Sequence, residues 1–160
     1  MIVFLIIFKY LTAPYKEPVR DMTPISYNLS IIAWVESGKN ALAVSSMGAI
    51  GEHQIMPATL KRFNRAFKTK FRLKNLHHII LNRIIARWTF IKDWEHFYKT
   101  DHPKDRLVKT FNSYNMGAGK TDKGIYYHWY LDQICPLEFK MFLDKHKILW
   151  RGKRFLRIEI

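Results

Sequence analysis

The chain has 160 residues and a mass of 19.2 kDa, a length typical of one domain with short extensions. Hydrophobic residues make up 48% and aromatic residues 15% of the sequence, which excludes extensive disorder because disordered chains lack such residues. Lysine and arginine total 27 against 13 aspartate and glutamate residues, and the net charge of +14 favours an anionic partner: nucleic acid, an anionic membrane or an acidic envelope polymer.

The N-terminal segment begins with eight apolar residues that end at Lys9. This run is too short for a membrane-spanning helix, which needs about 20 apolar residues. No basic segment precedes it and no small-residue cleavage site follows, so it is not a convincing signal peptide. We expect it to pack on the domain as a strand or helix, with a degenerate export signal or a membrane-surface anchor as alternatives. Residues 1–23 are predicted to form this segment and a linker.

Apolar residues at helical spacing predict a mostly α chain. The first helix should cover residues 24–37, with Thr23 as its cap, Pro24 at its first position and Gly38 as its stop. Four more helices are predicted: one that begins at Pro57, one that includes Leu81–Ile91, one over residues 104–115 and one over residues 137–147. The glycine- and serine-containing residues 37–56 are predicted to be a structured loop.

The basic C-terminal residues 148–160 are interpreted as a tail, with a strand as the alternative. Cys135 is the only cysteine, so an intrachain disulfide is excluded and a buried, inert thiol is expected. The seven histidines show no metal-ligand spacing and no phosphate-binding glycine loop is present, so we expect neither a metal nor a cofactor.

Two motifs carry the functional information. The first begins with a glutamate-serine pair at a helix end and continues into a glycine-rich turn and a methionine-proline helix start. Its positions are Glu36, Ser37, Asn40, Ala43, Val44, Ser45, Gly48, Ala49, Gly51, Gln54, Met56, Pro57 and Thr59. The second is Ser113-Tyr114-Asn115-Met116-Gly117-Ala118-Gly119, which follows a long helical stretch.

The first motif resembles the signature of the soluble lytic transglycosylases, and the other motif is similar to that family's alanine-tyrosine-asparagine-alanine-glycine motif. The resemblance covers residues 24–120, and both motifs occur in the family's order. It implies a lysozyme-like single domain of the goose type, which we place at residues 24–147. It also implies cleavage of the bond between N-acetylmuramic acid and N-acetylglucosamine in peptidoglycan.

Glu36 is the candidate catalytic acid. Glycoside cleavage needs a proton donor that stays protonated near neutral pH. A carboxylate at a helix C-terminus faces the negative end of the helix dipole, and apolar neighbours add a desolvation cost, so both disfavour ionisation. The alternative is a solvated glutamate paired with Lys39. No spacing marks a second carboxylate, although Glu52 is the nearest downstream, and the family is known to use a single acid.

The resemblance also implies roles for other residues. Tyr114 would position Glu36, with a core tyrosine as the alternative. Gln54 would bind the glycan, unless it only stabilises the loop. Ser45 and Asn115 are weaker substrate-binding candidates, balanced against turn and capping roles.

Two departures from the family pattern stand out. Glu52-His53 replaces the family's leucine-methionine, so His53 is expected to alter substrate contacts or bring a titratable group near the cleft. Asn40-Ala41 also lacks the usual intervening proline. Neither change removes the proposed acid.

No acidic residue lies between Glu52 and Asp93, an interval that holds ten of the 27 basic residues. Aromatic residues interleave with them, and we interpret the aromatics as core and the charges as a solvated face that attracts acidic envelope polymers. Nucleic acid is the less favoured partner.

The expected function is therefore a peptidoglycan lytic transglycosylase acting in the cell envelope. A bacteriophage virion or lysis component, or a specialised secretion system, is the expected setting. Two alternatives remain open: a muramidase that hydrolyses the same bond, and a non-catalytic module on the same fold that binds cell wall or nucleic acid.

Overall fold

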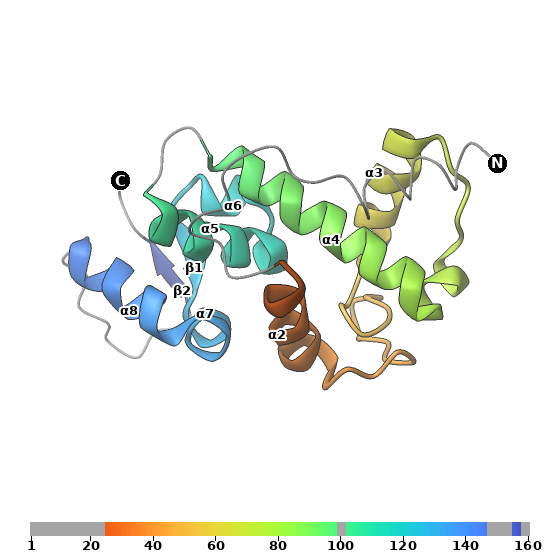
Figure 1. The fold of residues 1–160 in the computed structure, drawn as a ribbon, viewed down its shortest axis with the longest axis horizontal. Coiled ribbons are helices and arrows are strands. Elements are labelled where there is room, and N and C mark those ends of the chain that lie inside the picture. Colours follow the sequence, from red (N-terminus) through yellow and green to blue (C-terminus); the bar gives the residue numbers. More distant parts are fainter. Residues whose placement is uncertain (1–24, 99–101, 147–154, 158–160) are drawn as a thin grey trace. The chain divides into compact units, whose positions relative to one another are not determined.

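The structure, a computed structural model, describes residues 25–98, 102–146 and 155–157 (Figure 1). Its chain divides into two units, Met1–Thr89 and Phe90–Ile160. Helices dominate the described residues of both units, as the sequence predicts. The predictions for residues 1–23, including the apolar run and the Thr23 cap, lie outside the described residues. So does most of the predicted tail.

The described residues of the first unit form four helical segments, with the longest loop, residues 38–56, between the first two of them. The four segments are α2 (Ile25–Ser37), α3 (Pro57–Phe67), the 3-10 helix η1 (Leu73–His77) and the first turns of α4 (Ile79–His96). The predicted helices at 24–37, at Pro57 and around Leu81–Ile91 are confirmed over the described residues. The 3-10 helix was not predicted, because five residues are too few to show a periodic pattern.

The core of the first unit forms where the predicted apolar stripes meet. Ile32 of α2 and Ile85 of α4 are fully buried, as is Leu76 of η1. Four aromatic rings of the basic interval pack on one another, with centroids 4.5 to 6.4 Å apart: Phe63, Phe67, Phe71 and Trp88. Phe63 is buried and the other three rings are half-buried, so the interpretation of these aromatics as core is confirmed for Phe63.

Over its described residues, the second unit contains the last turns of α4, four further helices and two short strands. They are α5 (Pro103–Met116), α6 (Ala118–Thr121), β1 (Ile125–Tyr127), α7 (His128–Ile134), α8 (Pro136–Lys145) and β2 (Phe155–Arg157). The predicted helices at 104–115 and 137–147 are confirmed as α5 and α8. Helix α5 ends at Met116, one residue beyond its predicted end, and Ala118 and Gly119 begin α6.

The strands β1 and β2 pair antiparallel, with Tyr126 opposite Leu156. The strand alternative for the C-terminal residues is therefore observed at Phe155–Arg157. Tyr126 is fully buried, and its ring lies 5.2 Å from that of Phe142 on α8. Cys135, between α7 and α8, is 3% exposed, and burial raises the pKa of its thiol well above the ordinary value. The thiol is therefore buried, as predicted.

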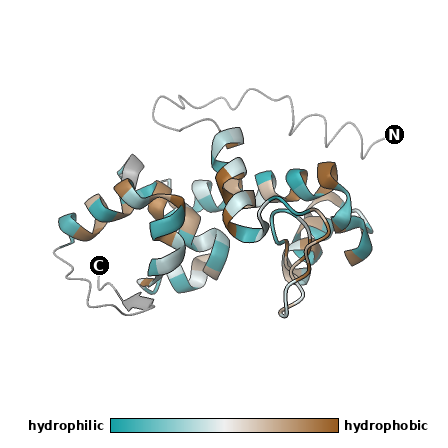
Figure 2. Ribbon diagram, turned by 90° about the horizontal axis from the view of Figure 1, so that it is seen from below, coloured by the Kyte–Doolittle hydropathy of each residue, from teal (hydrophilic) through white to brown (hydrophobic). Residues whose placement is uncertain are grey.

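Polar and apolar residues share most helices, as the mixed colours of Figure 2 show. Helices of this mixed composition contain both buried and exposed residues. No helix among the described residues is long and apolar enough to cross a membrane.

Candidate active site

Glu36 lies in the last turn of α2, whose end is fixed by two backbone hydrogen bonds. The N–H of Gly38 donates to the carbonyl of Trp34, and the N–H of Lys39 donates to the carbonyl of Ala33, each at 2.9 Å. Gly38 has a φ of +61°, a left-handed conformation that glycine adopts without a Cβ penalty. The helix therefore stops just after Glu36 and leaves this half-buried side chain at the start of the loop.

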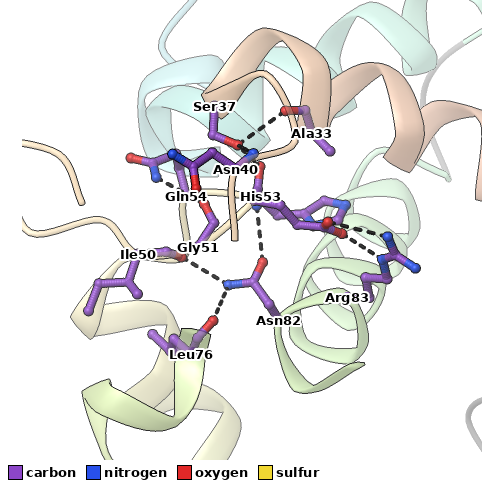
Figure 3. A network of polar contacts seen from close by, with 11 residues as sticks. Ala33, Ser37, Asn40, Ile50, Gly51, His53, Gln54, Leu76, Asn82 and Arg83 are labelled. Atoms are coloured by element: carbon purple, nitrogen blue, oxygen red, sulfur yellow. Dashed lines mark hydrogen bonds and ion pairs between the residues drawn. The ribbon is translucent and has the colours of Figure 1, made fainter. Parts of the chain in front are cut away.

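Ser37 fastens this helix end to the far side of the loop. Its hydroxyl donates to the backbone carbonyl of Glu52 at 2.8 Å and accepts the N–H of Asn40 at 3.1 Å (Figure 3). The contact with Glu52 joins positions that are 15 residues apart. The backbone next to Glu36 is thereby held at a fixed place relative to residues 50–53.

Ser45 and Gln54 both stabilise the loop in which they lie. The hydroxyl of Ser45 accepts the N–H of Ala49 at 3.0 Å, which closes a tight turn. The side-chain amide of Gln54 donates to the carbonyl of Gly51 at 2.9 Å. These bonds match the turn-stabilising alternatives for the two residues, and a glycan contact by either of them stays a prediction.

Asn82 of α4 holds the same loop from its other side (Figure 3). Its side chain is buried, accepts the N–H of His53 at 3.0 Å, and donates to the carbonyls of Ile50 and Leu76 at 2.9 Å each. The amide approaches so closely that a Cβ on Gly51 would lie 2.1 Å from its nitrogen. Only glycine allows this contact, so the motif glycine is required by packing as well as by its φ of +82°.

Glu52 is buried and ion-paired. Its residue is 3% exposed, and its carboxylate accepts hydrogen bonds from Arg83 Nε at 2.6 Å and Arg83 Nη2 at 3.3 Å. The hydrogen bond to Glu52 in turn raises the pKa of Arg83. A buried carboxylate requires such a partner, because removing it from water is costly. Glu52 therefore anchors the loop to α4.

His53 lies beside this ion pair and is 2% exposed. Its Nδ1 is 3.2 Å from Glu52 Oε1. Burial lowers the pKa of His53 from the ordinary 6.5, and the negative charge of Glu52 opposes that shift without reversing it. The side chain lines a pocket together with Glu52 and Arg83. A contact between His53 and the glycan stays a prediction.

The second motif lies at the C-terminal end of α5, in the other unit. Tyr114 is half-buried there, Asn115 is exposed, and Gly117 follows with a φ of +88°. Asn112, one turn earlier, is fully buried and donates to the hydroxyl of Thr121 and the carbonyl of Ile125 at 2.9 and 2.8 Å. This side chain fixes the segment after the motif onto α5, much as Asn82 fixes the first motif onto α4.

Each motif therefore lies at the end of a helix, and a buried asparagine holds the segment that follows: Asn82 of α4 for the first motif, and Asn112 of α5 itself for the second. A model of the transglycosylase SLT domain matches residues 23–129, more than half of the chain. The chain belongs to the transglycosylase SLT domain family. Comparisons with curated proteins and with solved structures gave no match.

SLT domains are lytic transglycosylases, which cleave glycosidic bonds of peptidoglycan. This SLT domain is therefore an enzyme that binds peptidoglycan and acts in the cell envelope. The match reaches into both units, so the two motifs belong to one family domain, and the predicted lysozyme-like, mostly helical fold is confirmed. In the described part of this SLT domain, no three histidine, cysteine, aspartate or glutamate side chains gather as a metal site.

The burial of His53 predicts that the stability of the SLT domain depends on pH. Its pKa in the folded SLT domain is lower than in the unfolded chain, so the unfolded chain takes up the proton first as the pH falls. The contribution of His53 to the free energy of unfolding is therefore complete above pH 6.5 and declines below it, by at most about 1.4 kcal/mol per pH unit. His53→Met should reduce the dependence of the free energy of unfolding on pH. Urea unfolding at a series of pH values, from near neutral down to the acid limit of folding, measures this dependence.

The control for this experiment is His78→Met, since His78 is exposed. We expect that variant to keep the wild-type dependence on pH. An equal dependence for wild type and His53→Met would show that the proton uptake arises elsewhere.

Sequence reasoning missed three residues that shape the site: Asn82, Arg83 and Asn112. A local signal existed for the asparagines, because Asn82 lies three residues before the buried Ile85 and Asn112 follows the buried Phe111. A polar side chain within a buried stripe needs partners. Arg83 gave no such signal, because its partner Glu52 lies 31 residues away.

Proposed function

We propose that Glu36 is the single acid and base of a transglycosylation that forms a 1,6-anhydro ring. Glu36 gives its proton to the glycosidic oxygen between N-acetylmuramic acid and N-acetylglucosamine as the bond to the anomeric carbon breaks. The acetamido group of the substrate stabilises the positive charge that develops. Glu36 then takes the proton of the muramoyl 6-hydroxyl, whose oxygen bonds to the anomeric carbon without water.

One observation carries this proposal. Among the described residues of the first unit, Glu36 and Glu52 are the only carboxylates. Glu52 is buried and held by Arg83, so it is committed to the loop anchor. Hydrolysis by two carboxylates would need a second side chain facing the same bond. A route with one acid needs only Glu36, which lies half-buried at a helix end that two separate contacts fix.

The other motif residues support the cleavage step in this proposal. Tyr114 positions Glu36, and Gln54, Ser45 and Asn115 contact the glycan, as the resemblance implies. Gln54 and Ser45 use part of their hydrogen-bonding capacity within the loop. His53 acts on substrate through the pocket that it lines.

We further propose that the catalytic domain extends to residue 147. Helices α7 and α8 continue beyond the family match, and both pack on α5, which carries the second motif. The strand β2 also pairs with β1 of the same unit. Residues beyond the family match therefore complete the unit that holds the second motif.

The basic surface supports an anionic envelope as the setting. Nine of the ten cations between Glu52 and Asp93 are exposed, namely Lys61, Arg62, Arg65, Lys68, Lys70, Arg72, Lys74, Arg83 and Lys92. Peptidoglycan stem peptides carry carboxylates, and opposite charges raise the local concentration of a substrate. A setting in a bacteriophage virion or lysis system stays a prediction of the sequence.

Mass spectrometry of the products from digested sacculi tests the mechanism. We expect muropeptides that end in 1,6-anhydro-N-acetylmuramic acid, which are one water lighter than reducing muropeptides. Products with reducing ends alone would instead identify a muramidase. Binding to sacculi with no released product would identify a non-catalytic wall-binding module.

A further inference from the structure

A pocket of about 420 Å³ lies within the first unit, between α2 and the first turns of α4. Its volume is in the range of small-ligand sites, about 300–1,000 Å³. The walls are apolar and come from Leu29, Ala33, Ile80 and Ile84, and two hydroxyl groups, those of Ser26 and Ser30, add hydrogen-bonding capacity. Such a lining suits a ligand with small apolar groups and a few polar ones.

Positive charge dominates the pocket. Lys39, Arg83 and Arg87 line it, against the single carboxylate of Glu52, which Arg83 already binds. No carboxylate of the described residues forms an ion pair with Lys39 or Arg87. The ammonium group of Lys39 lies 5.4 Å from the ring centre of Trp34 instead. The pocket therefore carries excess positive charge.

Arg87 gives a second indication of an anionic ligand. Its Nε is buried and has no hydrogen-bond partner among the described residues. A buried donor without an acceptor costs free energy, and a bound carboxylate is the planar acceptor that a guanidinium group prefers. A small shift of the side chain would let such a ligand satisfy it.

We propose that this pocket binds a carboxylate of the peptidoglycan stem peptide while the attached glycan is cleaved. The methyl groups of the stem alanines pack on the apolar walls, and the carboxylate lies between Lys39 and Arg87. This inference rests on the proposed function, because it is the glycan strand that brings the stem peptide to the enzyme.

The distances allow this arrangement. Lys39 follows Glu36 by three residues, so their Cα atoms are at most about 11 Å apart. A stem peptide of four extended residues spans up to about 14 Å. A stem that leaves a muramic acid held at Glu36 can therefore reach Lys39.

Direct titration tests the pocket without any cleavage. The probe is a synthetic wall tetrapeptide with free carboxylates, compared with the same peptide in amidated form and with inorganic phosphate. We expect Lys39→Gln/Arg87→Gln to raise the Kd of the free-carboxylate peptide at least about tenfold. Lys123→Gln/Lys140→Gln is the matched control, because it removes the same charge from exposed positions outside both the pocket and the basic interval and should keep the wild-type Kd.

Three outcomes would overturn the proposal: equal Kd values for the two double variants, equal binding of the amidated peptide, or equally tight binding of phosphate. Circular dichroism confirms that each variant is folded. Cleavage assays separate this proposal from the proposed function, using glycan strands with and without stem peptides. The Lys39→Gln/Arg87→Gln variant should lower the cleavage rate on strands with stem peptides relative to the rate on strands without them. A wild-type enzyme that cleaves neither strand would refute the proposed function and leave the titration valid.

Discussion

Replacing Glu36 with glutamine is expected to lower the rate of muropeptide release from purified sacculi by at least about 100-fold. Glutamine has the shape of glutamate, but it neither gives a proton to the leaving oxygen nor takes one from the 6-hydroxyl. Both steps of the proposed reaction depend on this single side chain, so no second residue replaces it. Release of soluble products, followed by chromatography, measures the effect.

Two comparisons make the Glu36→Gln result specific. Thermal unfolding should show a folded variant, because α2 ends through the backbone bonds of Gly38 and Lys39, which the substitution leaves in place. Glu95→Gln is the control carboxylate, since Glu95 is exposed on α4 and pairs only with Lys92 among the contacts described. Wild-type activity of Glu36→Gln would refute the mechanism.

Replacing Gly51 with alanine is expected to destabilise the protein by at least about 3 kcal/mol. The new Cβ would lie 2.1 Å from the amide nitrogen of Asn82 and 2.7 Å from the backbone carbonyl of Leu76. Asn82 would have to move, and the carbonyls and the N–H that it satisfies would lose their partners. The φ of +82° adds the cost of a left-handed alanine.

Gly48→Ala is the matched control for this experiment. Gly48 lies in the same loop with a φ of +80°, but its Cβ would meet only Pro57, at an ordinary 3.9 Å. Backbone strain alone should cost about 1–2 kcal/mol there. Urea unfolding measures both variants, and equal losses would show that the Asn82 contact is unimportant. Where Gly51→Ala remains folded, we also expect slower cleavage, because residues 50–53 help to hold the backbone beside Glu36.

The candidate acid could be located from the sequence because its surroundings are local. The apolar spacing of Leu29 and Ile32 defines α2, and Gly38 stops it, so Glu36 falls at a helix end without any knowledge of the tertiary structure. Pro57 starts α3 for an equally local reason, since its fixed φ suits a first helical position. The family resemblance rests on the same contiguous residues.

The environment of Glu52 and His53 was decided only by the tertiary structure. From the sequence, the pair was a departure from the family pattern near a proposed cleft. The structure buries both side chains, and their partners Arg83 and Asn82 lie 31 and 29 residues further along the chain. Contacts over such separations leave no periodic trace in a sequence, because they depend on where the loop meets α4.

The short elements of the second unit show the same limit. Strand β1 has three residues and pairs with a strand about 30 positions away, so neither alternation nor length could reveal it. The sequence by itself determined the longer helices, the two motifs and the family, because local spacing and contiguous residues encode them; the short η1, α6 and α7 were not predicted. Only folding decided which polar side chains became anchors, because burial and pairing depend on neighbours that are distant in the chain.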